Sequence, residues 1–143
     1  MPSYLFVLCP PYSGSTLLWK LLSTSQNVSS LPDEGQFLPE LEGIMRNKPW
    51  DASRALPWRD IKAVWESYWD MSKPVLLEKS PPNIIRTQDI EANFQPVSFV
   101  VMVTALVMIR YDLTGATAIV AGLLAGLLVA AVNTALIVVA RVP

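Results

Sequence analysis

A short turn of small hydroxyl residues around one glycine, Ser13 to Thr16, has the composition of a binding site. It lies between an apolar run that predicts a buried strand and a leucine-rich segment that predicts a helix. Glycine permits a positive φ and a close approach of the backbone. N–H groups at a helix start bind anions, and hydroxyls add further donors. The turn is therefore suited to a phosphate or a phosphosulfate, although a simple capped helix start would use the same residue types.

The turn differs from the nucleotide-binding P-loop, whose pattern is GxxxxGK[ST]. It has neither the second glycine nor the lysine, and Tyr12 stands directly before it. A cation is available further along the chain, since Lys79 follows a second apolar run that predicts a strand. Ligands of α/β sheets bind at the carboxyl ends of the strands. Lys79 is thus a candidate for the same site, with a solvated ion pair to Glu78 or Glu34 as the alternative.

The composition excludes several classes of site. The chain has no histidine, which removes Ser-His-Asp and Cys-His catalysis and every histidine-containing metal site, and we expect no metal centre. Its single cysteine, Cys9, lies in an apolar run and is expected to be a core residue. A net charge of −1 with 16% charged residues provides no basic surface for nucleic acid.

The elements that must position the turn alternate between strands and helices. Three apolar runs predict buried strands, at 4–9, 74–80 and 97–103. Helices are expected at 16–23, 36–45 and 58–71, and from Ser80 onwards. This alternation indicates an α/β fold, a partial three-layer parallel sheet of about three strands with flanking helices. The aromatic residues of 58–71 could contact a carbohydrate or a peptide, but large aromatic side chains are expected mainly in the core.

Four motifs in this order resemble the sulfotransferases that use 3′-phosphoadenosine 5′-phosphosulfate (PAPS), in their tyrosylprotein and glycan branches. LCPPYSGSTLLWKLL, residues 8–22, resembles the 5′-phosphosulfate loop, with Tyr12 in the place of a basic residue. LPDEGQFLPEL, residues 31–41, resembles the segment that carries an acidic residue near the acceptor hydroxyl. LLEKSPPNIIR, residues 76–86, resembles the lysine-containing strand end that opens onto PAPS. FQPVSFVVMV, residues 94–103, resembles the strand that ends in an arginine for the 3′-phosphate.

This resemblance implies a P-loop-like fold and the transfer of a sulfuryl group from PAPS to a hydroxyl acceptor, which would be a glycan, a peptide or a small molecule. The residues that would hold the phosphosulfate are Tyr12, Ser13, Gly14, Ser15 and Thr16. Lys79 would place positive charge on the leaving phosphate. Glu34 would be the base for the acceptor hydroxyl, with Asp33 and Glu78 as rivals.

The sequence departs from the family pattern after Val103. Thr104 stands where an arginine is expected, and Arg110 is near but out of place. The remainder of a sulfotransferase domain does not follow, so the resemblance implies impaired activity. The alternative is a catalytically inactive, membrane-anchored fragment, or a fusion or frameshift product of a sulfotransferase gene. A nucleotide kinase of P-loop ancestry is a weaker alternative, because the P-loop lysine is missing.

An apolar run without charges extends from 113 to 140, and Arg141 is the one charged residue after Asp112. A helix of about 20 apolar residues spans a bilayer. The run therefore predicts a single-pass, C-terminal membrane anchor of unassigned orientation, with a helix buried in a soluble fold as the alternative. Gly122 and Gly126 form a GxxxG pair, which favours helix self-association but is also common in lipid-facing helices.

We thus expect three parts: a sulfotransferase-like domain at 1–103, a junction at 104–112 and a transmembrane helix at 113–140.

Overall fold

The computed structural model describes residues 1–101, 120, 123–124 and 127–128. The chain divides into two compact units, Met1–Met102 and Val103–Pro143. The predicted junction, the GxxxG glycines and most of the predicted membrane helix lie outside the described residues. Within the part of the chain that is described, no helix has the length and apolar character needed to cross a bilayer.

The first unit is built on a sheet of four parallel strands in the order β2-β3-β1-β4. The strands are β1 (Ser3–Leu8), β2 (Val28–Ser30), β3 (Val75–Glu78) and β4 (Val97–Val101). The α/β class and the parallel pairing are confirmed. The sheet has one strand more than predicted, because β2 is only three residues long and mostly serine, and so lacks an apolar run.

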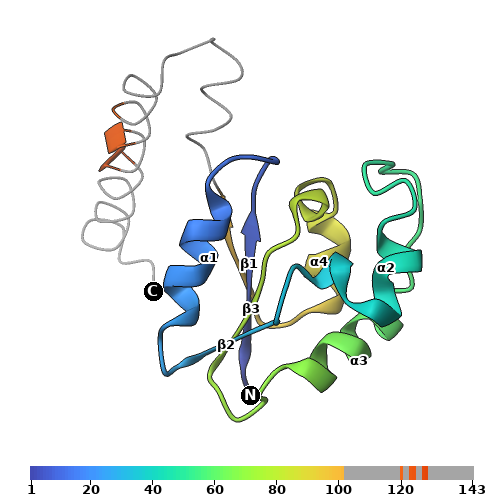
Figure 1. Ribbon diagram of the computed structural model, residues 1–143, viewed down its shortest axis with the longest axis horizontal. Helices are drawn as coiled ribbons and strands as arrows, with labels where there is room; N and C mark the ends of the chain where they lie inside the picture. Colours follow the sequence, from blue (N-terminus) through green and yellow to red (C-terminus); the bar gives the residue numbers. More distant parts are fainter. Residues whose placement is uncertain (102–119, 121–122, 125–126, 129–143) are drawn as a thin grey trace, which may run out of the picture. The chain divides into compact units, whose positions relative to one another are not determined.

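Four α-helices flank this sheet in two groups. They are α1 (Ser15–Ser23), α2 (Pro39–Met45), α3 (Trp58–Tyr68) and α4 (Thr87–Asn93). In Figure 1, α1 lies on one side of the sheet, and α2, α3 and α4 lie on the other. Two short 3-10 helices, η1 (Gly35–Phe37) and η2 (Pro81–Ile85), follow β2 and β3. The main core lies between the sheet and the second group, since its helical members all come from α2, α3 and α4.

Aromatic rings fill the centre of this core. The rings of Phe6 and Phe94 meet edge to face with centroids 5.1 Å apart, and Trp65 lies 5.6 Å from Phe94. Trp58 and Trp69 are also buried. The three tryptophans of the 58–71 segment therefore pack into the core, as large apolar side chains tend to do, whereas Tyr68 is exposed.

Three predicted helices have different bounds in the structure. The helix expected at 36–45 is two elements, η1 and α2, because Leu38 is extended at φ −64° and ψ 136° before Pro39. A residue before proline is disfavoured in the helical region. The helix expected at 58–71 ends at Tyr68. The helix expected from Ser80 is the 3-10 helix η2, which α4 follows after a break at Arg86.

Candidate functional site

A cavity of about 440 Å³ lies at the carboxyl ends of β1 and β3. Its lining includes the whole predicted turn from Tyr12 to Thr16, together with Glu34 and Lys79. The predicted site residues, which extend from Tyr12 to Lys79 in the sequence, thus meet at one end of the sheet. This is the edge at which parallel α/β sheets bind their ligands.

The turn has the backbone geometry of an anion cradle. Gly14 is the residue before α1 and has φ 78° and ψ 6°, in the left-handed region that glycine adopts without strain. A Cβ at this position would meet nothing within 4 Å, so glycine is required for its conformation and not for space. The first N–H groups of a helix have no intrahelical partner and are free to bind a ligand.

Ser13 supplies a second feature that suits an anion. Its Oγ is buried and has no hydrogen-bond partner among the described residues. A buried hydroxyl without a partner is costly, by about 1–3 kcal/mol. An anion held by the turn would give this hydroxyl the acceptor that it lacks, so the turn suits an anionic ligand.

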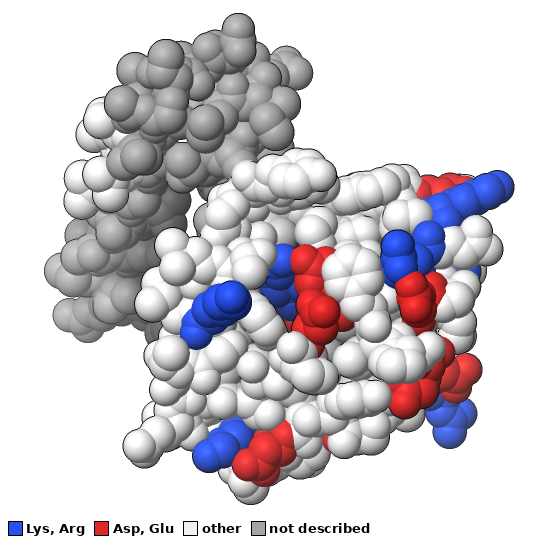
Figure 2. All heavy atoms as spheres, viewed as in Figure 1, with Lys and Arg blue, Asp and Glu red and all other residues white. Residues whose placement is uncertain are grey.

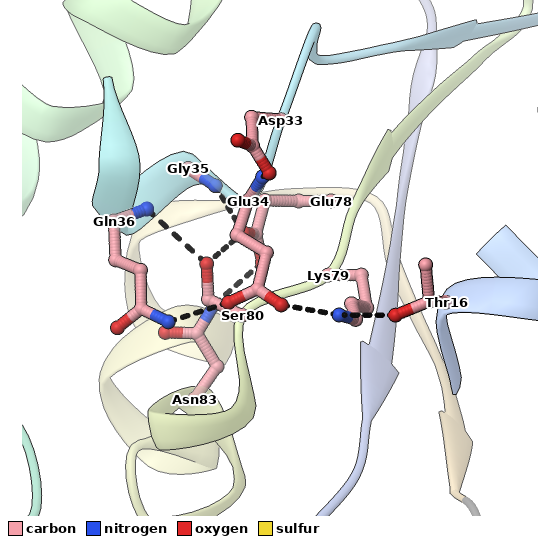
Figure 3. Close-up of polar contacts among 9 residues, drawn as sticks. All are labelled: Thr16, Asp33, Glu34, Gly35, Gln36, Glu78, Lys79, Ser80 and Asn83. Atoms are coloured by element: carbon pink, nitrogen blue, oxygen red, sulfur yellow. Dashed lines mark hydrogen bonds and ion pairs between the residues drawn. The ribbon is translucent and has the colours of Figure 1, made fainter. Parts of the chain in front are cut away.

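Lys79 directly follows β3 and is buried, with 5% of its surface exposed. Its Nζ donates a hydrogen bond of 3.2 Å to Thr16 Oγ1 and forms an ion pair with Glu34 Oε1 (Figure 3). The ion pair of the alternative interpretation is therefore present, with Glu34 and not with Glu78, but the lysine is buried and not solvated. The ammonium group lies beside the start of α1, where it can add full positive charge to the partial charge of the helix end.

Glu34 is the carboxylate that faces the cavity. Its two oxygens accept hydrogen bonds from Lys79 Nζ and from Gln36 Nε2 (Figure 3). Asp33 is exposed and outside the lining, and its Oδ1 accepts a hydrogen bond of 2.7 Å from the Glu34 N–H. Of the two neighbouring acids, the geometry thus favours Glu34 as the base.

Glu78 is fully buried behind the cavity wall and holds the Glu34 segment in place. It accepts hydrogen bonds from the Gly35 N–H at 3.0 Å, from Asn83 Nδ2 at 2.6 Å and from Ser80 Oγ. Burial raises the pKa of Glu78 to about 7, against the opposite effect of these donors. Because Glu78 does not line the cavity, we assign it a positioning role.

The same segment is tied to the core through Gly35, which the sequence did not indicate as a site residue. Trp65 Nε1 donates a hydrogen bond of 3.3 Å to the Gly35 carbonyl oxygen. A Cβ on Gly35 would lie 2.5 Å from Trp65 Nε1, so only glycine fits against the indole ring. The signal in the sequence was the glycine itself, directly after Glu34.

Aromatic side chains form part of the cavity wall. Tyr12 has φ 61° and is fully exposed, so it brings a ring and no charge to the place where the resemblance implies a basic residue. Phe37 and Trp50 also line the cavity and are about half exposed. Sequence analysis assigned neither to the site: Trp50 belongs to an irregular segment without a motif, and Phe37 lies in the 31–41 motif but was given no role.

The remaining features lie in the core or outside the described residues. Cys9 is completely buried, and burial raises the pKa of its thiol, which confirms its expected core role. Among the described residues, no three histidine, cysteine, aspartate or glutamate side chains are placed to hold a metal ion. The expected defect in the 3′-phosphate site, at Thr104 and Arg110, lies outside the described residues.

Neither the family models nor the curated proteins contain a match to this chain. The likeness to sulfotransferases therefore depends on the four sequence motifs alone.

Proposed function

We propose that the chain binds PAPS in this cavity and transfers its sulfuryl group to a hydroxyl acceptor. The observation that carries the proposal is the buried ammonium of Lys79, held between Thr16 at the start of α1 and the carboxylate of Glu34. This arrangement combines anion-binding groups and a base within one cavity. Ser13 Oγ and the N–H groups of the turn are the remaining donors for the phosphosulfate.

The reaction needs positioning and charge stabilisation more than covalent chemistry. The bond from the sulfur to the phosphate oxygen breaks, and a bond from the sulfur to the acceptor oxygen forms. Glu34 takes the proton of the acceptor hydroxyl, and 3′-phosphoadenosine 5′-phosphate leaves with the negative charge that Lys79 stabilises. When the anion binds Lys79, it competes with Glu34 for the ammonium, so the carboxylate becomes available to the acceptor.

Titration of the full chain, in mild detergent, with 3′-phosphoadenosine 5′-phosphate tests this proposal by calorimetry. We expect saturable binding that Lys79→Met weakens by about tenfold to a hundredfold, since hydrogen bonds to charged groups contribute about 1.5–3 kcal/mol. Lys20→Met, at an exposed lysine at the other end of α1, is the matched control and should leave the affinity unchanged. Absence of saturable binding would refute the proposal.

A second candidate is a catalytically inactive, membrane-anchored fragment or fusion product, and one sequence observation favours it. After β4, Thr104 stands where the resemblance implies an arginine, and the first arginine is Arg110. Loss of such a charged contact to the 3′-phosphate would lower the affinity for PAPS. Transfer of ³⁵S from labelled PAPS to a pool of hydroxyl acceptors separates the candidates, since the inactive form would bind nucleotide without turnover.

We also propose that the apolar run 113–140 inserts into a lipid bilayer and anchors the protein. Its length and lack of charge support this. Extraction of membranes at alkaline pH is the test: an inserted helix stays with the membrane fraction, whereas a peripheral protein is released. Gly122→Leu and Gly126→Leu would reduce self-association in a membrane dimerisation assay if the GxxxG pair packs two helices together.

A further inference from the structure

We propose that Glu78, Ser80 and Asn83 form a buried proton-binding cluster, and that an anion bound in the cavity makes this cluster take up a proton. The coupling rests on the proposed function, because the anion is the nucleotide that the cavity is proposed to bind. It makes nucleotide binding depend on pH. The sequence motifs contain no sign of it, since Glu78 was only a rival for the role of base.

The cluster has hydrogen-bond partners for both forms of the carboxyl group. As a carboxylate, Glu78 accepts hydrogen bonds at Oε1 from the Gly35 N–H at 3.0 Å and from the Ser80 hydroxyl. At Oε2 it accepts one from Asn83 Nδ2 at 2.6 Å. Asn83 Oδ1 is buried and has no partner among the described residues. When the Asn83 amide turns over, Oδ1 takes the place of Nδ2 and accepts a hydrogen bond from a proton on Oε2. The proton can therefore be bound without movement of the backbone.

Glu78 is buried without a cation to balance its charge. Its exposed fraction is 1%, and no ion pair joins it to a lysine or an arginine within the described residues. The strand β1 places the neutral Phe6 opposite it, and the charged group that acts on it is the carboxylate of Glu34. Burial and this like charge both favour the protonated form, and the pKa of Glu78 is raised to about 7. Near neutral pH, a change in the local charge therefore alters how much of the cluster is protonated.

Cations of the neighbouring segments, other than Lys79, are bonded elsewhere or open to solvent. Arg86, at the end of η2, donates a hydrogen bond of 2.9 Å to the carbonyl oxygen of Asp51, next to Trp50. Three more cations belong to the segment 46–54, lie outside the cavity lining and are at least partly exposed: Arg46, Lys48 and Arg54. Water and salt screen exposed charges of this kind. They can attract an anion to the cavity, but they balance the charge at the buried cluster only weakly.

An anion in the cavity adds negative charge next to the cluster. Lys79 is the one lysine or arginine among the described residues that line the cavity, and a nucleotide with two phosphate groups carries more charge than one ammonium balances. On the face drawn in Figure 2, most basic groups lie beside acidic ones and form no basic patch that would supply the balance. Binding also draws Lys79 away from Glu34, whose carboxylate already acts on Glu78. The proton affinity of the cluster therefore increases when the anion binds.

The number of protons taken up on binding tests this coupling. The full chain, in mild detergent, is titrated with 3′-phosphoadenosine 5′-phosphate by calorimetry at pH 7.5, in two buffers that differ in their heat of protonation. We expect the protein to take up about 0.3–0.7 more protons per bound nucleotide than Glu78→Gln, whose carboxamide cannot titrate. This difference removes any protons of the nucleotide itself. Relative to the variant, the affinity of the unchanged protein should fall about threefold or more between pH 6.5 and 8.5. Glu91→Gln, at an exposed helix position, is the matched control and should behave like the unchanged protein.

Infrared spectroscopy of the unchanged protein is a second measurement, which needs no variant to fold. The C=O stretch of a protonated carboxyl is separate from the carboxylate bands, ordinary carboxyl groups are ionised near pH 7, and the nucleotide has no carboxyl group. The remaining band should persist to higher pH when the nucleotide is bound. Nucleotide binding with no extra proton uptake, or with an unchanged carboxyl band, would overturn the coupling. Uptake that persists in Glu78→Gln would place the proton on another group and would also overturn it. Absence of nucleotide binding would instead refute the proposed function itself.

Discussion

The buried carboxyl of Glu78 makes the stability of the protein depend on pH. Its pKa in the folded chain is about 7, and the ordinary value is 4.5. The folded state therefore binds this proton more tightly than the unfolded state does. The corresponding stability is fully present below pH 4.5 and is lost as the pH rises to about 7. At about 1.4 kcal/mol per pH unit, the loss amounts to about 3 kcal/mol.

Glu78→Gln tests this reasoning, since a carboxamide is neutral at every pH and keeps an oxygen that can accept from the Gly35 N–H. The free energy of unfolding is measured by urea titration between pH 4.5 and 8, with tryptophan fluorescence as the signal. All five tryptophans lie at or before Trp69 and so report on the first unit. In the unchanged protein, the free energy of unfolding should fall by about 3 kcal/mol over this pH range. In the variant, most of this fall should be absent. Glu91→Gln, at an exposed helix position, is the control. An unchanged pH profile in Glu78→Gln would refute the argument.

Three further predictions concern the cavity. Gly35→Ala should lower the free energy of unfolding by about 1–3 kcal/mol, because its methyl group overlaps the Trp65 indole; urea unfolding measures this. Glu34→Gln should lower the rate of sulfuryl transfer by about 10²–10⁴ without weakening nucleotide binding, because the neutral side chain competes less for Lys79; separate kinetic and calorimetric measurements would show this. Tyr12→Arg should tighten nucleotide binding about fivefold at low salt, and the gain should shrink in 1 M salt; equal gains at both salt concentrations would contradict a charge effect.

The sequence predicted the elements that carry a clear pattern. The apolar runs gave β1, β3 and β4, and the glycine turn was correctly placed between β1 and α1. The strand β2 was missed because two of its three residues are serine, and the break between η2 and α4 was missed because only Ile90 of the seven α4 residues is buried. Elements stabilised mainly by their neighbours leave little periodicity for sequence analysis to use.

The site residues that come directly after a strand were predictable from the sequence. Those whose position depends on irregular segments were not. Lys79 follows β3 and the turn follows β1, so their meeting at one sheet edge follows from parallel topology. The contact between Lys79 and Glu34 depends on a segment fixed by Gly35 and Glu78. The position of Trp50 depends on Arg86, and such long-range contacts between irregular segments have no local signature.

The packing of Gly35 against Trp65 joins the segment of the proposed base to the hydrophobic core of the first unit. The Trp65 indole is completely buried, and it also donates a hydrogen bond to the carbonyl oxygen of Gly35, next to the proposed base. A cavity-creating change at Trp65 would therefore behave like an active-site lesion, although it touches no ligand. Under the proposed function, selection for turnover would constrain this interior residue as strictly as a residue of the cavity.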